Sequence, residues 1–357
     1  MNKFYLLGIA TVITAMISCD DGPEVKTTRT YRMGFQNSAP RPDVTITIQA
    51  LQIWTTRADA AIITTEVPWD SIYAGKSIPA FVINNYLGLV NFYRSKNFKM
   101  WVYIDPQNGL NRTINSNALV ARNKSIADTD VQKLYRRFAV VMDSILRPEH
   151  LGLALETNLI RLVSSSAIYN GVKKAANDAV ADVRAIDKLV KLSVSIQADV
   201  AWGNPKVAST YLGIGQDYID FPFIDELGIS SYPYFSVDNP DDLPIDYYSR
   251  LVEGKSLPVF VSEGGWTTQN IVIPNQPTIK GSNEVQQKYI ARQSQLLDKV
   301  NATALFQLTF TDIDLSSYPP SVDPNINFFV YLGMVDVNLQ GKPAWETWGG
   351  IFKRTLR

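Results

Sequence analysis

Eight short apolar runs, each ending in polar residues, constrain the fold of this chain more than any other feature. The runs comprise residues 31–36, 60–65, 99–104, 151–155, 191–197, 227–231, 258–262 and 302–310. Apolar residues at helical spacing lie between some of these runs, for example at 131–145 and 284–300. Eight strands that alternate with helices are the number a closed parallel barrel needs, so the sequence predicts an α/β fold, a single (β/α)8 TIM barrel.

The segment after the first run departs from this order. Val44, Ile46 and Ile48 alternate as in a strand, although a barrel requires a helix there, and both a helix of β-branched residues and an extra hairpin fit. No change of composition marks an internal boundary, so residues 31–357 are predicted to form one domain. Long loops at 267–282 and 311–327 are expected to overhang the barrel mouth.

The amino-terminal residues are typical of a lipoprotein signal peptide. Lys3 precedes an apolar run from 4 to 17, and residues 16–19 resemble a bacterial lipobox that ends in Cys19, the only cysteine. We therefore expect a signal peptide at 1–18, a lipid anchor on Cys19 and a tether at 19–30. The expected location is the bacterial cell envelope, at the outer membrane or cell surface. A plain secreted chain cleaved elsewhere is the alternative.

The ionisable residues exclude several classes of function. Basic and acidic side chains number 34 each, so the chain offers no basic surface for nucleic acid. Its one histidine, His150, precedes the fourth run, which argues against histidine-based acid/base catalysis and against a histidine metal cluster. We expect no metal or organic cofactor, and a monomer.

Two glutamates are the best candidates for chemistry. Glu156 and Glu263 end the fourth and seventh runs, and strand ends converge at one mouth of a parallel barrel. Glycoside hydrolysis needs two such carboxyl groups, about 5–5.5 Å apart in a retaining enzyme. The apolar residues before Glu156 are expected to raise its pKa. An ion pair or a helix cap is the structural alternative for either glutamate.

Three short motifs resemble clan A of the glycoside hydrolases, the retaining four/seven superfamily. Residues 227–234 are similar to the sixth strand of arabinogalactan endo-galactanases, and residues 261–266 to the seventh-strand motif of the clan. The resemblance implies that Glu156 is the acid/base and Glu263 the nucleophile in the cleavage of a β-linked saccharide. It also implies that Tyr232, or else Tyr234, donates a hydrogen bond to the nucleophile.

The chain departs from the clan pattern in places. Leu155 stands where most members have asparagine, and an asparagine follows only at Asn158. The usual second-strand arginine is missing from residues 65–69, and Phe306 and Gln307 lie in the eighth run where tryptophan is common. An unusual substrate or a non-catalytic surface glycan-binding lipoprotein would explain these departures. A structural or adhesive lipoprotein is a third hypothesis, and it predicts a shallow mouth without exposed aromatic residues.

Other strand-end residues are predicted to contact the substrate. Trp266 is expected to stack on a sugar ring, and Trp69 is expected at the barrel mouth. Glu66 is expected to lie beside Glu156 and raise its pKa. Carboxylates at these positions are also frequent helix caps. The predicted substrate-binding residues are Asn158, Tyr232, Tyr234, Trp266, Trp69, Glu66, Asp105, Gln107, Trp202, Asp312 and Asp314.

Overall fold

The computed structural model describes residues 27–203, 210–272 and 277–357. Within them, eight parallel strands form one sheet in the order β2-β11-β10-β9-β8-β7-β4-β3. A parallel bridge between Gln36 and Ile62 joins the two outer strands and closes the sheet into the predicted barrel. The strands are β2 (Arg32–Phe35), β3 (Ala60–Glu66), β4 (Lys99–Asp105), β7 (His150–Gly152), β8 (Lys191–Gln197), β9 (Glu226–Ser231), β10 (Val259–Gly264) and β11 (Ala302–Gln307).

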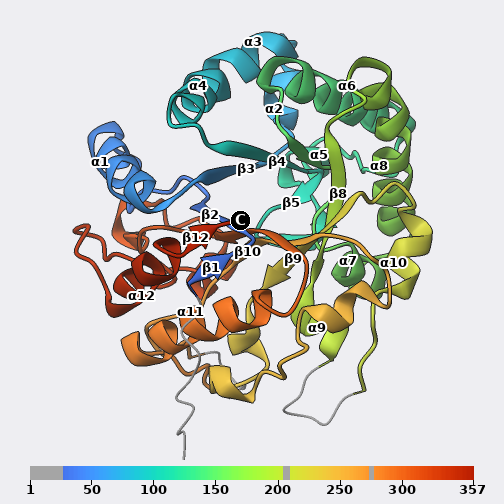
Figure 1. Cartoon of the computed structure of the whole chain (residues 1–357). Coiled ribbons are helices and arrows are strands. Elements are labelled where there is room, and N and C mark those ends of the chain that lie inside the picture. Colours follow the sequence, from blue (N-terminus) through green and yellow to red (C-terminus); the bar gives the residue numbers. More distant parts are fainter. Residues whose placement is uncertain (1–26, 204–209, 273–276) are drawn as a thin grey trace, which may run out of the picture.

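Helices surround the barrel, as Figure 1 shows. They are α1 (Val44–Trp54), α2 (Trp69–Tyr73), α3 (Ile78–Val82), α4 (Gly88–Ser95), α5 (Asn117–Val120), α6 (Thr129–Leu146), α7 (Thr157–Val163), α8 (Ser166–Ile186), α9 (Ala198–Trp202), α10 (Gly215–Asp220), α11 (Asn283–Leu297) and α12 (Pro343–Phe352). Short 3-10 turns connect β9 to β10 in place of an α-helix.

The ambiguous segment after β2 is a helix, α1, rather than a hairpin. The Asp43 side chain caps it by accepting a hydrogen bond from the Ile46 amide at 3.0 Å. Ile46, Ala50 and Trp54 recur at a spacing of four and are buried, whereas Val44 is 76% exposed. Burial of this one face outweighs the low helix propensity of β-branched residues.

The barrel interior is a packed core. Its members are Ala60, Ile62, Trp101, Tyr103, Leu155, Phe260, Ala304 and Phe306. Two strand glycines make room for Tyr103, because a Cβ atom at Gly152 or Gly228 would lie 2.3 Å from its side chain. The interior therefore contains no channel, and polar chemistry is confined to the barrel ends.

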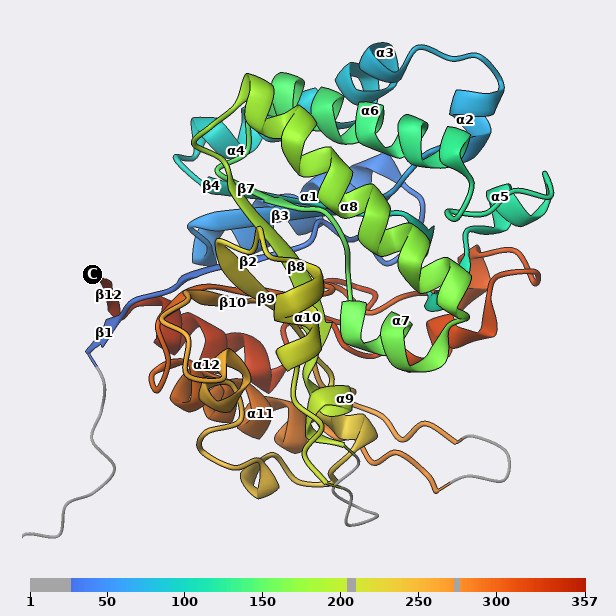
Figure 2. The same ribbon diagram turned by 90° about the vertical axis from the view of Figure 1, so that its right-hand side faces the viewer.

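The two ends of the described chain meet at the base of the barrel. Strand β1 (Thr28–Arg29) pairs in parallel with β12 (Thr355–Leu356), and Figure 2 shows both opposite the end where α5 and α7 lie. Arg29 is buried and forms an ion pair with Asp59 at 2.6 Å. The predicted tether of 19–30 is therefore too long, because its last residues belong to the folded domain. Cys19 and the predicted signal peptide lie outside the described residues.

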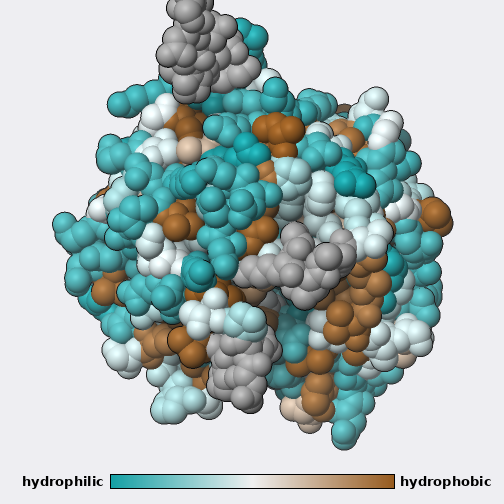
Figure 3. Space-filling model, turned by 90° about the horizontal axis from the view of Figure 1, so that it is seen from below, coloured by the Kyte–Doolittle hydropathy of each residue, from teal (hydrophilic) through white to brown (hydrophobic). Residues whose placement is uncertain are grey.

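Among the described helices, none is both long and apolar enough to cross a lipid bilayer. Figure 3 shows a largely hydrophilic face with apolar areas between the hydrophilic ones.

Candidate active site

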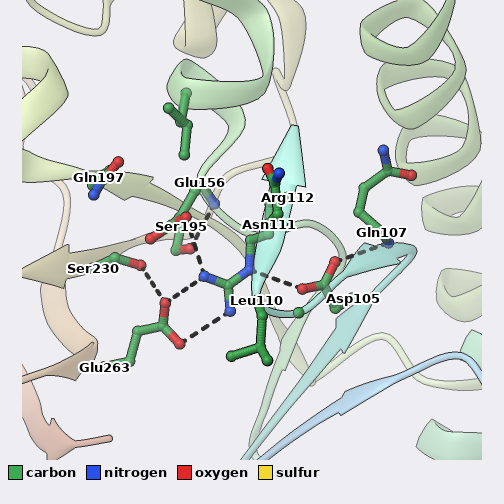
Figure 4. Close-up of polar contacts among 12 residues, drawn as sticks. Asp105, Gln107, Leu110, Asn111, Arg112, Glu156, Ser195, Gln197, Ser230 and Glu263 are labelled. Carbon is green, nitrogen blue, oxygen red and sulfur yellow. Dashed lines mark hydrogen bonds and ion pairs between the residues drawn. The ribbon is translucent and has the colours of Figure 1, made fainter. Parts of the chain in front are cut away.

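Glu156 and Glu263 meet at the carboxyl ends of the barrel strands. Glu263 lies in β10, and Glu156 lies between β7 and α7. Nη1 of Arg112 lies 2.7 Å from Glu263 Oε1 and 3.1 Å from Glu156 Oε2 (Figure 4). The two facing oxygens can be no farther apart than these two distances combined. The sequence-predicted pair thus shares one site.

Arg112 is the residue that the sequence prediction missed. It lies on a hairpin of β5 (Gln107–Asn108) and β6 (Asn111–Asn115), which follows β4. Its Nη2 also binds Glu263 at 3.2 Å, and its Nε binds Asp105 at 2.8 Å. Burial acts to lower the pKa of Arg112, but Glu263, Glu156 and Asp105 raise that pKa well above its usual value. The guanidinium therefore stays charged.

The two glutamates have unlike surroundings. Burial raises the pKa of Glu156 to about 7, since Arg112 only partly offsets the desolvation and Glu263 adds repulsion. Glu263 instead accepts a hydrogen bond from Ser230 Oγ at 2.9 Å in addition to the two from Arg112. These donors stabilise the charge of Glu263. Near neutral pH, Glu156 is thus suited to carry a proton.

The backbone at Glu156 is strained. Its φ of 50° and ψ of 45° lie in the left-handed region, which costs a non-glycine residue about 1–3 kcal/mol. The Glu156 amide donates a hydrogen bond to Ser195 Oγ at 3.0 Å, which helps to hold this conformation. Such strain is concentrated at functional sites, because the surrounding fold must maintain it.

Two cavities open onto the pair from different sides. The Glu263 cavity, of about 330 Å³, is lined by Gln36, Ser38, Thr64, Thr65, Glu66, Asp105, Gly109, Leu110, Arg112, Tyr232, Glu263, Leu308, Thr309, Ile313, Ile326 and Phe329. The Glu156 cavity, of about 320 Å³, is lined by Gly109, Leu110, Asn111, Arg112, Glu156, Leu159, Gln197, Tyr232, Phe235, Asn325, Phe328 and Phe329. Arg112, the hairpin tip, Tyr232 and Phe329 form the shared wall.

The long loop after β11 builds part of the mouth, as expected. Ile313 and Ile326 line the Glu263 cavity, and Asn325 lines the Glu156 cavity. Asn325 Nδ2 also donates to the Leu110 carbonyl at 3.3 Å and so ties this loop to the hairpin tip. The described residues of the 267–282 loop line neither cavity.

Three of the predicted substrate-binding residues line these cavities. Asp105 and Tyr232 are buried at the mouth, and Glu66 is exposed at its rim. Glu66 Oε1 accepts a hydrogen bond from the Gly109 amide at 2.7 Å. Its predicted effect on Glu156 is wrong, because the repulsion that raises the pKa of Glu156 comes from Glu263 and Asp105.

The tyrosine assignments also need correction. No hydrogen bond joins Tyr232 to Glu263, both of which are described, and the donors to Glu263 are Ser230 and Arg112. Tyr232 instead donates its backbone amide to Asp199 at 3.2 Å. Tyr234 is fully buried, with its hydroxyl bound to the Phe328 carbonyl at 3.0 Å. Tyr234 is therefore a packing residue.

The predicted aromatic platforms are wrong. Trp266 and Trp69 are 0% and 1% exposed, so neither presents a free face to a sugar ring. Trp266 packs against Tyr234 and Tyr289 beneath the mouth. The half-buried phenylalanines of the Glu156 cavity are the aromatic residues that the mouth offers: Phe235, Phe328 and Phe329.

Asn158 and Gln107 have structural contacts. The buried Asn158 side chain bonds both the amide and the carbonyl of Gln197, at 2.8 and 2.9 Å, and thereby fixes α7 to the end of β8. Gln107 donates to the Ile114 carbonyl within the hairpin at 3.1 Å and, in Figure 4, points away from Glu263. Neither side chain lines the two cavities, so both substrate-contact predictions are wrong.

The remaining predicted residues lie elsewhere. Trp202 stacks on Tyr247, with 5.5 Å between ring centroids, and lines a separate cavity beside α9. Asp312 forms a buried ion pair with Lys342 at 2.6 Å. Asp314 caps a 3-10 turn by accepting a hydrogen bond from the Ser316 amide at 3.1 Å. The helix-cap alternative thus holds for Asp314.

Comparisons with known proteins identify the fold. No protein-family model matches the chain, and no curated protein sequence does. A GH5_18 protein from Bifidobacterium longum, solved with Manβ1-4GlcNAc, is similar in structure, with a TM-score of 0.60, 14% identity and coverage of 90% of this chain and 78% of that one. A Ruminococcus gnavus β-glucuronidase, solved with uronic isofagomine, has a TM-score of 0.59 and 13% identity, with coverage of 92% and 51%.

The β-D-glucuronidase of Dictyoglomus thermophilum is also similar, with a TM-score of 0.55, 14% identity and coverage of 91% and 51%. The chain therefore spans about half the length of these glucuronidases. At this level of identity the likeness establishes a barrel of the kind found in known glycosidases.

Proposed function

We propose that the protein is a retaining glycoside hydrolase that cleaves a β-linked polysaccharide or oligosaccharide. One observation carries the proposal: the glutamates after the fourth and seventh barrel strands share the guanidinium of Arg112, and burial raises the pKa of Glu156 to about 7. Both carboxyl groups contact one nitrogen of Arg112, as a closely spaced pair requires, and a retaining enzyme needs the two carboxyl groups about 5–5.5 Å apart. The fold likeness to glycosidases agrees with this proposal.

Contacts within the cluster assign roles to individual oxygens. Glu263 Oε1 accepts from both Ser230 and Arg112, whereas Oε2 accepts only from Arg112 Nη2, at 3.2 Å. Oε2 therefore keeps a lone pair with which to attack the anomeric carbon. Glu156 Oε2 faces Arg112, which leaves Oε1 to deliver a proton to the leaving oxygen.

The proposed reaction has two steps. In the first, Glu263 forms an ester bond to the anomeric carbon while the glycosidic bond breaks and the leaving oxygen takes the proton of Glu156. In the second, ionised Glu156 takes a proton from water, and the resulting oxygen nucleophile displaces Glu263. Both carboxyl groups return to their starting protonation states.

The two cavities correspond to the two sides of the scissile bond. The sugar that is attacked occupies the Glu263 cavity, and the leaving group occupies the Glu156 cavity, where phenylalanine side chains can stack on it. A saccharide that crosses the shared wall requires Arg112 to give up its contact with Glu156. Arg112 remains attached to the other side of the cluster through Asp105 and Glu263.

A non-catalytic glycan-binding protein is the second candidate. The position of Arg112 favours it, because the guanidinium occupies the space between the two carboxyl groups. If Arg112 never leaves this space, a glycan can bind in either cavity but cannot be cleaved.

The deciding experiment is a panel of β-linked glycans, including β-galactans, assayed for new reducing ends. The wild-type protein, Glu156→Gln and Glu263→Ala are compared, with affinity measured in parallel. The enzyme hypothesis expects cleavage by the wild type alone, with affinity largely kept in Glu156→Gln. Affinity without cleavage in all three proteins supports the glycan-binding hypothesis.

We also propose that a lipid anchor on Cys19 holds the protein at the bacterial cell envelope. The sequence of residues 1–19 supports this proposal. Incorporation of labelled palmitate should occur in the wild type and disappear in Cys19→Ser. Unlabelled wild-type protein in the culture medium would instead support a plain secreted chain.

A further inference from the structure

We infer that the Glu263 cavity accepts a neutral or positively charged sugar and rejects a uronic acid. This inference rests on the proposed function, which places the attacked sugar in that cavity. Whether the attacked sugar is neutral or acidic is an open choice among the similar solved structures, because one was solved with Manβ1-4GlcNAc and another with uronic isofagomine.

The charges around the Glu263 cavity are unbalanced. Three carboxylates line it, from Glu66, Asp105 and Glu263, and Arg112 is the one cationic side chain among the described lining residues. Asp105 and Glu263 are 1% and 2% exposed, so solvent screens them poorly. A sugar carboxylate entering this space would meet net negative charge at short range.

Arg112 is not available to offset that repulsion. Its Nε, Nη1 and Nη2 already lie 2.8, 2.7 and 3.2 Å from carboxylate oxygens of Asp105 and Glu263. A uronate could obtain a paired hydrogen bond from this guanidinium only by displacing one of these buried carboxylates. The displaced carboxylate would then be left buried without its cation.

Five neutral polar side chains of the lining can bind hydroxyl groups, beside apolar residues such as Leu308 and Ile313. Gln36, Ser38, Thr64, Thr65 and Thr309 contribute neutral donors and acceptors, as recognition of an uncharged ring requires. Glu66 lies at the rim in register with Asp105 on the neighbouring strand, and its exposed carboxylate can pair with an ammonium group. An amino sugar is therefore compatible with the cavity.

The test is a set of β-linked disaccharides in gluco, galacto and manno forms, each with a neutral, an amino or a uronic acid sugar at the non-reducing end. Binding is measured by calorimetry at low and high salt with Glu156→Gln, which keeps every charge of the Glu263 cavity. In the form that binds best, we expect the uronic member to bind at least tenfold more weakly than the neutral one. We also expect the difference to shrink at high salt.

Glu66→Gln, made in the same background, sharpens the test. Removal of the Glu66 charge should reduce severalfold the ratio of the affinity for the neutral ligand to the affinity for the uronic ligand. Glu346 is an exposed residue of α12, and Glu346→Gln should leave this affinity ratio unchanged. Equal or tighter binding of the uronic members, or no binding of any disaccharide, would overturn the inference.

The outcomes separate this inference from the proposed function. If wild-type protein binds neutral disaccharides in preference to uronic ones but cleaves none, the inference stands and the enzyme hypothesis fails. If it cleaves the uronic members best, the enzyme hypothesis stands and the inference fails.

Discussion

The base and the mouth of the barrel differ in how their ionisable side chains are paired. At the base, ionisable side chains form separate one-to-one contacts: His150 Nδ1 lies 2.6 Å from Glu226 Oε1, and Lys99 Nζ lies 3.3 Å from Glu149 Oε1. The His150 ring also stacks on Trp101, with 3.7 Å between ring centroids. At the mouth, three buried carboxylates share the single guanidinium of Arg112.

This difference in pairing indicates what the base and the mouth each contribute to the protein. At the base, the buried Glu226 has a partner of its own in His150, so removal of either side chain would leave a buried polar group unpaired. The mouth keeps excess negative charge and a strained residue, Glu156, both of which lower stability. A fold retains such features where chemistry or recognition requires them.

The largest predicted effect comes from Glu263→Gln. Loss of the nucleophile should lower kcat by on the order of 10³-fold or more on whichever glycan the panel identifies. Glu226→Gln is the matched control, because Glu226 is equally buried but lies at the base. The control should keep its activity and lose thermal stability. If Glu263→Gln and Glu226→Gln lost activity to a similar extent, the mouth would not differ from the base in its role in activity.

The second effect concerns Arg112→Ala, measured against Arg29→Ala at the base. Without Arg112, Glu263 loses two donors, and activity should fall by about 10²-fold because the nucleophile is misplaced. Arg112→Lys should recover part of this activity, since it keeps the charge but not the paired geometry. Arg29→Ala should affect the melting temperature rather than kcat. A gain of activity in Arg112→Ala would instead show that the guanidinium blocks the site.

The third effect is on pH dependence. Glu156 must be protonated to donate, and its pKa is raised to about 7, so kcat/KM should fall about tenfold per pH unit above that pKa. Because Arg112 opposes this rise, Arg112→Ala should move the alkaline limb to higher pH. An alkaline limb that stays in place in Arg112→Ala would assign the titration to a group other than Glu156.

The smallest effect is expected at the leaving-group side. Phe328→Ala removes an aromatic face from the Glu156 cavity and should raise KM by about threefold to tenfold, with kcat little changed. Phe223→Ala is the control, because Phe223 is also half-buried but lines neither cavity. An equal rise in KM for both would indicate a general loss of packing.

Much of the fold could be predicted from the sequence, because a parallel barrel strand is buried on both faces and leaves an unbroken apolar run. The same logic located Glu156 and Glu263, since strand ends converge. It failed for Trp266, which follows two glycines, one of them Gly265 with φ of 157°. Trp266 is buried and packs against Tyr289 of α11 instead of lining the mouth.

Arg112 could not be predicted by those rules. Arg112 lies on a short polar hairpin beyond the end of a strand. In such a segment, neither hydrophobic periodicity nor a sequence motif indicates which side chain faces the mouth. The missing second-strand arginine was the available signal, because a buried nucleophile still needs a cation from some other element. Searching the mouth loops for an unassigned arginine would have led to this residue.

The pairing of β1 with β12 has a geometric consequence for the whole molecule. Because the amino-terminal strand pairs at the base, the described chain begins at the end of the barrel opposite the mouth, and the proposed anchor on Cys19 would attach the protein from that end. A polymer arriving from the surrounding medium would then meet the opening first and would not have to pass between the protein and its support.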